Sequence, residues 1–355
     1  MNLKNNRAVK KNHDEKHLGR KLKSKLKRKN RNRSFQGLSK SEFRFKSRFR
    51  SYTVIKAPFK FSFLSSTEET IDFINKIEIC FSNRTKVFVD LEKVVEIDNS
   101  AITVLLSVMN LFKSKSIGFN GNYPLQEDAA VKLFNSGFFK SLYSHDRRLS
   151  YTFGKNNQLF TQENKKVVSS LGLPLVLEVS NTVFGEKRLL KGLQRVLLEL
   201  MQNTNNHAVI GSKGQKEWWL SVNHDQLNTK VSFSFVDYGV GVFESLKSKP
   251  TKSKWYGTYE KIKNRLTYGS NEEILRLLLE GDLHLTVTGH HYRGKGIPGM
   301  KQVQDRNQIS NLHVITNNAF ADVAGDNYKK LRNQFSGTFV YWEIGITNQS
   351  TEWSI

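Results

Sequence analysis

The chain has 355 residues, of which 38% are hydrophobic and 25% charged, and a formal net charge of +24. This length favours about two domains of roughly 150 residues, with enough apolar residues for a sizeable core. Cys80 is the only cysteine, which excludes an intrachain disulfide and a cysteine-based zinc site and favours a reducing compartment. No run approaches the roughly 18 consecutive apolar residues of a membrane span, so we expect a cytoplasmic protein without one.

The positive charge is concentrated in the first fifty residues. They hold 19 Lys and Arg residues against Asp14, Glu15 and Glu42. Self-repulsion and the small number of apolar residues predict a basic disordered tail over residues 1–50. Such a tail can neutralise phosphates of a nucleic acid or of another polyanion, and a solubilising role is the alternative.

Residues 51–150 alternate between strand and helix patterns. This order predicts a small α/β domain with a partly parallel sheet. The expected elements are a buried strand over 85–91, a helix over 100–112, a short strand from 117 and a helix over 127–135.

The segment from Val89 to Leu106, together with residues 134–142, resembles the STAS domain of anti-anti-sigma factors. In that family the first Ser of an Asp-Ser-Ser-Gly type turn is phosphorylated at the N-terminus of a helix. Here the turn contains Asp98, Asn99 and Ser100, so Asn stands where the phosphoserine would be. We expect these polar residues to cap the helix, and a phosphorylatable switch at Ser100 is the alternative.

A helix is expected from Glu186 to Ala208, because leucine and valine recur along one side of it. Within this helix Glu199, Asn203 and His207 follow one another at intervals of four residues. This spacing places three polar groups along one stripe of the helix. Taken alone, such a stripe is more often exposed surface than a site.

Apolar and polar residues alternate over 230–237, which predicts a strand. This strand leads directly into a turn that contains Asp237, Gly239 and Gly241. Two spaced glycines allow a ligand to approach the backbone closely, and the carboxylate can accept a proton from an amino group. In isolation this pattern is usually just a turn.

A second glycine-rich segment comprises Arg293, Gly294, Lys295 and Gly296, with Lys301 on the helix expected after it. Glycines expose backbone N–H groups ahead of a helix whose positive end favours phosphate. A dinucleotide-binding fold is nevertheless not expected, because no strand runs directly into this segment.

These segments, followed by Thr338 at the start of a strand over 336–344, resemble the GHKL (Bergerat) ATP-binding fold. That fold is shared by histidine kinases, anti-sigma serine kinases, gyrase-type ATPases and Hsp90, and the resemblance covers roughly residues 185–345. It implies an α/β sandwich that binds ATP and Mg²⁺. The expected fold class is therefore α/β (α+β). The expected order is the tail, a STAS-like domain over 51–150, a connecting segment over 151–184, a GHKL domain over 185–347 and a C-terminal tail over 348–355.

The resemblance also implies a role for each site residue. Glu199 would be the general base, Asn203 the Mg²⁺ ligand and Asp237 the acceptor for the adenine amino group. The remaining roles are a purine turn at Gly239 and Gly241, phosphate contacts at Arg293, Gly294, Lys295, Gly296 and Lys301, support of Asp237 by Thr338, and a less defined role for His207. These residue types suit the nucleotide, which needs an oxygen-ligated Mg²⁺, cations and N–H groups on its phosphates and a polar anchor for its base.

Three expectations concern the remaining segments. Residues 143–185 are expected to be a polar linker with strands. Trp218 and Trp219 are expected in a strand with one ring buried and the other partly exposed. Residues between Gly241 and Arg293 are expected to form either a lid or a structural insertion, with a helix over 271–280.

Two functions remain open on the sequence. We favour a regulatory ATP-binding protein with modest hydrolysis, in which bound nucleotide alters packing on the STAS-like domain and thereby the binding of a partner, an unidentified protein, by the basic tail. The alternative is a serine/threonine kinase of the anti-sigma type, an analogy that Asn99 weakens. Both a monomer and an oligomer are compatible with the sequence.

Overall fold

The computed structural model describes residues 49–136, 138, 150–153, 157–162, 169–207, 218–247, 264, 269–281 and 297–348. Contacts divide the chain into two units, residues 1–52 and 53–355, and the elements below belong to the second. The expected basic tail up to residue 48, the segment 293–296 and the C-terminal tail beyond 348 lie outside the described residues. None of the helices that can be described is long and apolar enough to cross a membrane.

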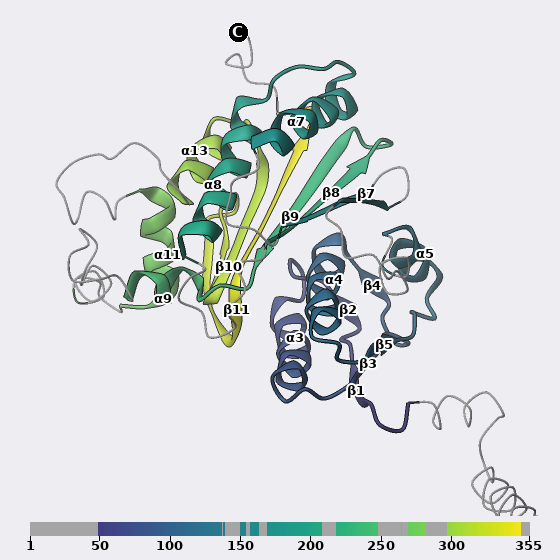
Figure 1. Ribbon diagram of the computed structural model, residues 1–355. Coiled ribbons are helices and arrows are strands. Elements are labelled where there is room, and N and C mark those ends of the chain that lie inside the picture. Colours follow the sequence, from purple (N-terminus) through teal and green to yellow (C-terminus); the bar gives the residue numbers. More distant parts are fainter. Residues whose placement is uncertain are drawn as a thin grey trace, which may run out of the picture. The chain divides into compact units, whose positions relative to one another are not determined.

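The first part of this unit is built from short parallel strands and helices (Figure 1). A three-stranded parallel sheet has the order β1-β3-β5, and β2 pairs in parallel with β4. The bounds are β1 (Thr53–Lys56), β2 (Lys60–Phe61), α3 (Thr67–Ser82), β3 (Val87–Asp90), β4 (Glu96–Ile97), α4 (Asn99–Ser114), β5 (Phe119–Gly121) and α5 (Glu127–Asn135). The strand and helix expectations for this region are confirmed, and α5 has its predicted bounds.

The second part is a six-stranded antiparallel sheet in the order β10-β11-β9-β8-β7-β6. Its strands are β6 (Ser150–Phe153), β7 (Asn157–Gln162), β8 (Trp218–Asp225), β9 (Lys230–Asp237), β10 (Ser310–Asp322) and β11 (Asn327–Gly345). The helices of this part are α7 (Ser169–Phe184), α8 (Lys191–His207), α9 (Gly241–Lys247), α11 (Asn271–Glu280) and α13 (Ile297–Asp305). With parallel and antiparallel sheets in one unit, the fold is mixed α/β of the α+β kind.

Both faces of the antiparallel sheet are covered. Successive side chains of a strand point to opposite faces, so alternate residues enter two different cores. Trp218 packs with the side chains of α7, α8, α11 and α13, whereas Trp219 packs with those of α3 and α4. The two rings are 1% and 5% exposed, so the expectation that one is partly exposed is wrong. The reason is that α4 covers the face that would otherwise be open.

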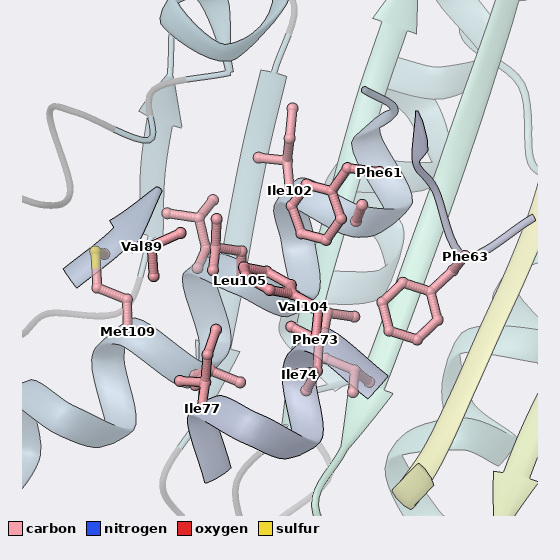
Figure 2. Packing of buried hydrophobic residues seen from close by; sticks show 14 of the residues in the cluster. Phe61, Phe63, Phe73, Ile74, Ile77, Val89, Ile102, Val104, Leu105 and Met109 are labelled. Atoms are coloured by element: carbon pink, nitrogen blue, oxygen red, sulfur yellow. The ribbon is translucent and has the colours of Figure 1, made fainter. Parts of the chain in front are cut away.

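The core between α3, α4 and the sheet joins residues far apart in the chain. Figure 2 shows Phe73 and Leu105 in this core, with Phe63 beside them. The Phe63 ring stacks on Phe339 of β11 with centroids 5.0 Å apart and meets Phe335 edge-on at 5.6 Å. The parallel-sheet region therefore has no core separate from that of the antiparallel sheet: it packs on one face of this sheet, in a single apolar core.

Two helix expectations differ from the structure. Residues 169–184 form α7, where strands and a polar linker are expected, because the β-branched side chains of this segment are buried between the sheet and α8. The next helix, α8, begins at Lys191 rather than at Glu186. Gly185 ends α7 in the left-handed region at φ 75°, and the Arg188 N–H then bonds to Ser180 Oγ at 2.9 Å. This bond holds the segment before α8 in a non-helical path.

His224 provides a test of the packing between β8 and α7. Its ring is 5% exposed, and Thr182 Oγ1 lies 2.8 Å from its Nδ1. Burial lowers the pKa of this imidazole below 6.5 in spite of the nearby Glu178. The unfolded chain therefore binds a proton below pH 6.5 that the folded chain resists, and stability falls as the pH drops through this range.

We expect His224→Leu to reduce the decrease in the free energy of unfolding that accompanies this fall in pH. Urea unfolding at pH 7 and pH 5 measures it, and the free energy of unfolding should change less for the variant than for the parent chain. Between pH 7 and pH 5 the variant should lose less stability than the parent chain, by at most about 1.4 kcal/mol for each unit by which the pKa of His224 is lowered. An equal loss of stability in the variant and the parent chain would contradict the lowered pKa of His224.

Candidate functional site

The candidate site is centred on Asp237, the last residue of β9. Asp237 pairs with Thr338 of β11 on one side and with Trp218 of β8 on the other. Two of the residues singled out in the sequence, 101 positions apart, are thus direct neighbours across the sheet. The Gly239 N–H donates to Asp237 Oδ1 at 2.9 Å, and the Thr338 N–H also donates to this carboxylate.

The Asp237 carboxyl group is held in an unfavourable environment for a charge. Burial raises its pKa from the usual 3.8 to about 6, and the two backbone N–H donors only partly offset this effect. Among the described residues, only backbone N–H groups donate to this carboxylate. A buried carboxylate that is charged at neutral pH and has so few donors is suited to receive a polar group of a ligand. Perturbed groups of this kind cluster at functional sites.

The turn after Asp237 requires its glycines. A Cβ at Gly239 would lie 2.9 Å from Asp237 Oδ1, so any side chain there would crowd the carboxylate. Gly241 has a φ of 75°, and a Cβ on it would clash with the Asn317 side chain, with Cγ only 2.6 Å away. The sequence pattern of one Asp and two spaced glycines therefore corresponds to a turn whose backbone is closely packed beside the Asp237 carboxylate.

Gly337 is the most constrained glycine of the site. Its φ is 121°, and a Cβ would clash with the backbone oxygen of Asp237. We expect Gly337→Ala to lower the free energy of unfolding by at least about 2–3 kcal/mol, because both the backbone strain and the contact oppose it. Chemical denaturation measures the change.

Gly172 of α7 is the matched control, because a Cβ there meets nothing within 4 Å. In the interior of a helix, Gly172→Ala should be neutral or stabilising by up to about 1 kcal/mol. A Gly337→Ala protein as stable as the control would contradict the account of β11.

Glu199 and Asn203 lie on α8, one turn apart, and both are half-buried. The predicted stripe is therefore confirmed for these two residues. His207 ends α8, and its side chain lies outside the described residues. In Figure 1, α8 and β9 run toward the end of the sheet that carries α9, which begins just after Asp237.

The residues expected around phosphates are described only in part. Arg293, Gly294, Lys295 and Gly296 lie outside the described residues. Lys301 lies on α13, and its Nζ is 2.9 Å from both carboxylate oxygens of Asp305, one turn along the same helix. Lys301 thus forms an ion pair with Asp305, and a phosphate would have to compete with the Asp305 carboxylate for the Lys301 ammonium group.

The turn that resembles the STAS motif forms a helix cap. Asp98 is the N-cap of α4, and its Oδ1 accepts the Ala101 N–H at 2.9 Å. Ser100 is 1% exposed; its Oγ donates to Asp98 and accepts the Phe63 N–H at 3.2 Å. The expected capping role is confirmed for Asp98.

The sequence motifs gave no role to three residues around Asp237. Thr316 and Asn317 of β10 bond to the turn after Asp237, and Tyr238 within that turn bonds to α4. The pair Asn317-Asn318 inside an apolar strand pattern is a signal that could have identified an irregularity, because asparagine is depleted in strands. Nothing in the local pattern indicates the partner of Tyr238, because Ser107 is 131 residues away.

Comparisons with protein-family models, with curated proteins and with solved structures found no match to this chain.

Proposed function

We propose that this chain is a regulatory ATP-binding protein of the GHKL type, which holds Mg-ATP around Asp237 and couples the bound nucleotide to its STAS-like part. The observation that carries the proposal is the Asp237 carboxylate, with a pKa raised to about 6, at the end of a strand and beside a glycine turn. Such a carboxylate can accept a hydrogen bond from the amino group of adenine. The pairing of Asp237 with Thr338 across β9 and β11 also supports the proposal, because it brings two motifs that are distant in the sequence into contact.

The described residues fit a nucleotide with its metal ion. Gly239 places no side chain against the Asp237 carboxylate, and Asn203 on α8 carries an amide oxygen of the kind that a hard cation binds. Bound Mg²⁺ would neutralise charge on the phosphates. The half-buried Glu199, one turn before Asn203, would orient a water molecule and take up its proton.

Hydrolysis is preferred over phosphate transfer to the chain's own STAS-like turn. A kinase acceptor must present its hydroxyl to the nucleotide, whereas Ser100 is 1% exposed and its Oγ is engaged by Asp98 and Phe63. We therefore propose modest ATP hydrolysis rather than serine/threonine kinase activity on Ser100.

Coupling to the STAS-like part is supported by Tyr238. This residue follows Asp237 directly, and its hydroxyl lies 2.6 Å from Ser107 Oγ in α4. The Tyr238 side chain is 5% exposed. A ligand that shifts the turn at Asp237 would therefore act on the contact with α4.

Thermal unfolding with added nucleotide tests the proposal. Mg-ATP should raise the unfolding midpoint in a concentration-dependent manner, because a ligand that binds the folded chain stabilises it by mass action. Mg-GTP is the matched control and should raise the midpoint less, since guanine carries a carbonyl oxygen where adenine carries its amino group. Equal shifts with both nucleotides would contradict an adenine anchor at Asp237.

A further inference from the structure

The strand β10 is irregular where it passes the candidate site. The register with β11 shifts between Thr316 and Asn317 and again between Asn317 and Ala319, and Asn317 has a φ of 50°. Thr316 is 0% exposed and Asn317 is 3% exposed. Two polar side chains buried at a bulge need hydrogen-bond partners, and bulges often re-aim side chains beside active sites.

Both side chains bond to the turn that follows Asp237. Asn317 Nδ2 donates to the Val240 carbonyl at 3.0 Å, and Asn317 Oδ1 accepts the Phe243 N–H at 3.3 Å. Thr316 Oγ1 accepts the Val242 N–H at 3.0 Å. Side chains of β10 therefore cap the N–H groups of Val242 and Phe243 in the first turn of α9. The Asn317 side chain also fills the space where a Cβ of Gly241 would be.

Thr316 also reaches the strand on its other side. Its hydroxyl lies 3.2 Å from the Gly337 carbonyl and 3.3 Å from Thr338 Oγ1. Thr338 in turn donates its N–H to the Asp237 carboxylate. The buried Thr316 hydroxyl thus connects Val242, after the glycine turn, with Thr338, the neighbour of Asp237.

We infer that Thr316 and Asn317 are positioning residues for base recognition, which hold the turn 238–242 and Thr338 in the geometry that selects adenine. This inference rests on the proposed function and adds to it the determinants of base selectivity. Neither residue needs to touch the nucleotide. Their effect is to fix the distance between the Asp237 carboxylate and the backbone that lies along the base.

The test compares binding of ATP with binding of inosine triphosphate, which lacks the 6-amino group, by calorimetry. Thr316→Val removes the hydroxyl at nearly constant shape and leaves the Val242 N–H without its acceptor. We expect the affinity for ATP to fall about tenfold while that for inosine triphosphate changes little, so that the discrimination between them narrows. Thr316→Ser keeps the hydroxyl and should restore both values.

Asn317→Gly is the second variant, because glycine tolerates the positive φ while the contacts to Val240 and Phe243 are lost. It should narrow the discrimination in the same way, and it replaces Thr316→Val if that variant does not fold. A folded variant with unchanged discrimination, or with equal weakening for both nucleotides, overturns the inference and leaves the proposed function standing. A parent chain that binds no ATP overturns the proposed function itself and this inference with it.

Discussion

Replacing Asp237 with asparagine should weaken binding of ATP by more than about tenfold and, in the same protein, raise the free energy of unfolding at pH 8. Binding falls because the charged acceptor for the adenine amino group is lost. Stability rises because the folded chain no longer holds a carboxylate whose pKa is raised from 3.8 to about 6. Asparagine retains an oxygen that can accept the Gly239 N–H.

The sign of the stability effect follows from proton linkage. The unfolded carboxyl group ionises near pH 3.8, whereas the folded group keeps its proton until about pH 6. Stability of the parent chain therefore decreases as the pH rises through this interval, by up to about 3 kcal/mol. The variant should exceed the parent by this amount at pH 8 and match it below about pH 4. For the same reason, ATP affinity of the parent chain should weaken as the pH falls through 6.

Asp225, at the end of the neighbouring strand β8, is the matched control. Its pKa is lowered, mainly by the hydrogen bond from the Asn228 side chain. Asp225→Asn should therefore leave ATP binding unchanged and should not stabilise the protein. Calorimetric titration and urea unfolding measure both quantities. A folded Asp237→Asn protein with unchanged ATP affinity would reject Asp237 as the base anchor.

Replacing Glu199 with glutamine should reduce phosphate release by about 10²- to 10⁴-fold while ATP binding is retained. The side chain keeps its shape but can no longer take up a proton from water. The substitution lies on the half-buried stripe of α8, away from the apolar side of the helix that enters the core. Single-turnover phosphate release, together with calorimetry, separates chemistry from binding.

The control for Glu199 is Gln202→Ala, which alters an exposed side chain of the same helix. It should leave both binding and phosphate release unchanged. Phosphate release by Glu199→Gln at the rate of the parent chain would remove Glu199 from the chemistry. Loss of ATP binding in that variant would instead assign Glu199 to the binding of nucleotide or metal.

The elements that sequence reasoning predicted well are those in which local signals agree. The strand 230–237 alternates cleanly and has the bounds of β9. The helix 271–280 has Ser270 before it in a capping box and ends at Gly281, with a φ of 83°. In both cases the periodicity and the terminating residues indicate the same structure.

The elements that were missed depend on contacts distant in the chain. The β-branched residues of 169–184 favour a strand, and only packing against α8 and the sheet makes them helical. Trp219 is buried because α4, about a hundred residues earlier, covers its face of the sheet. Neither effect is present in the local pattern.

The site shows the same division. Pattern and spacing singled out Asp237 and the stripe of Glu199 and Asn203, and the family resemblance added Thr338; their roles in a site stay predictions. They could not identify Thr316 and Asn317, whose role depends on a bulge in β10 that meets the turn 74 residues before it. Polyanion binding by residues 1–50 and phosphate contacts at 293–296 stay predictions.

Calorimetric titration of the purified chain with ATP and Mg²⁺ at pH 8, beside Asp237→Asn under the same conditions, is the decisive test of nucleotide binding at Asp237. We expect saturable binding by the parent chain and an affinity reduced by more than about tenfold in the variant. Binding of equal strength by the two folded proteins, or no binding by the parent chain, would contradict it.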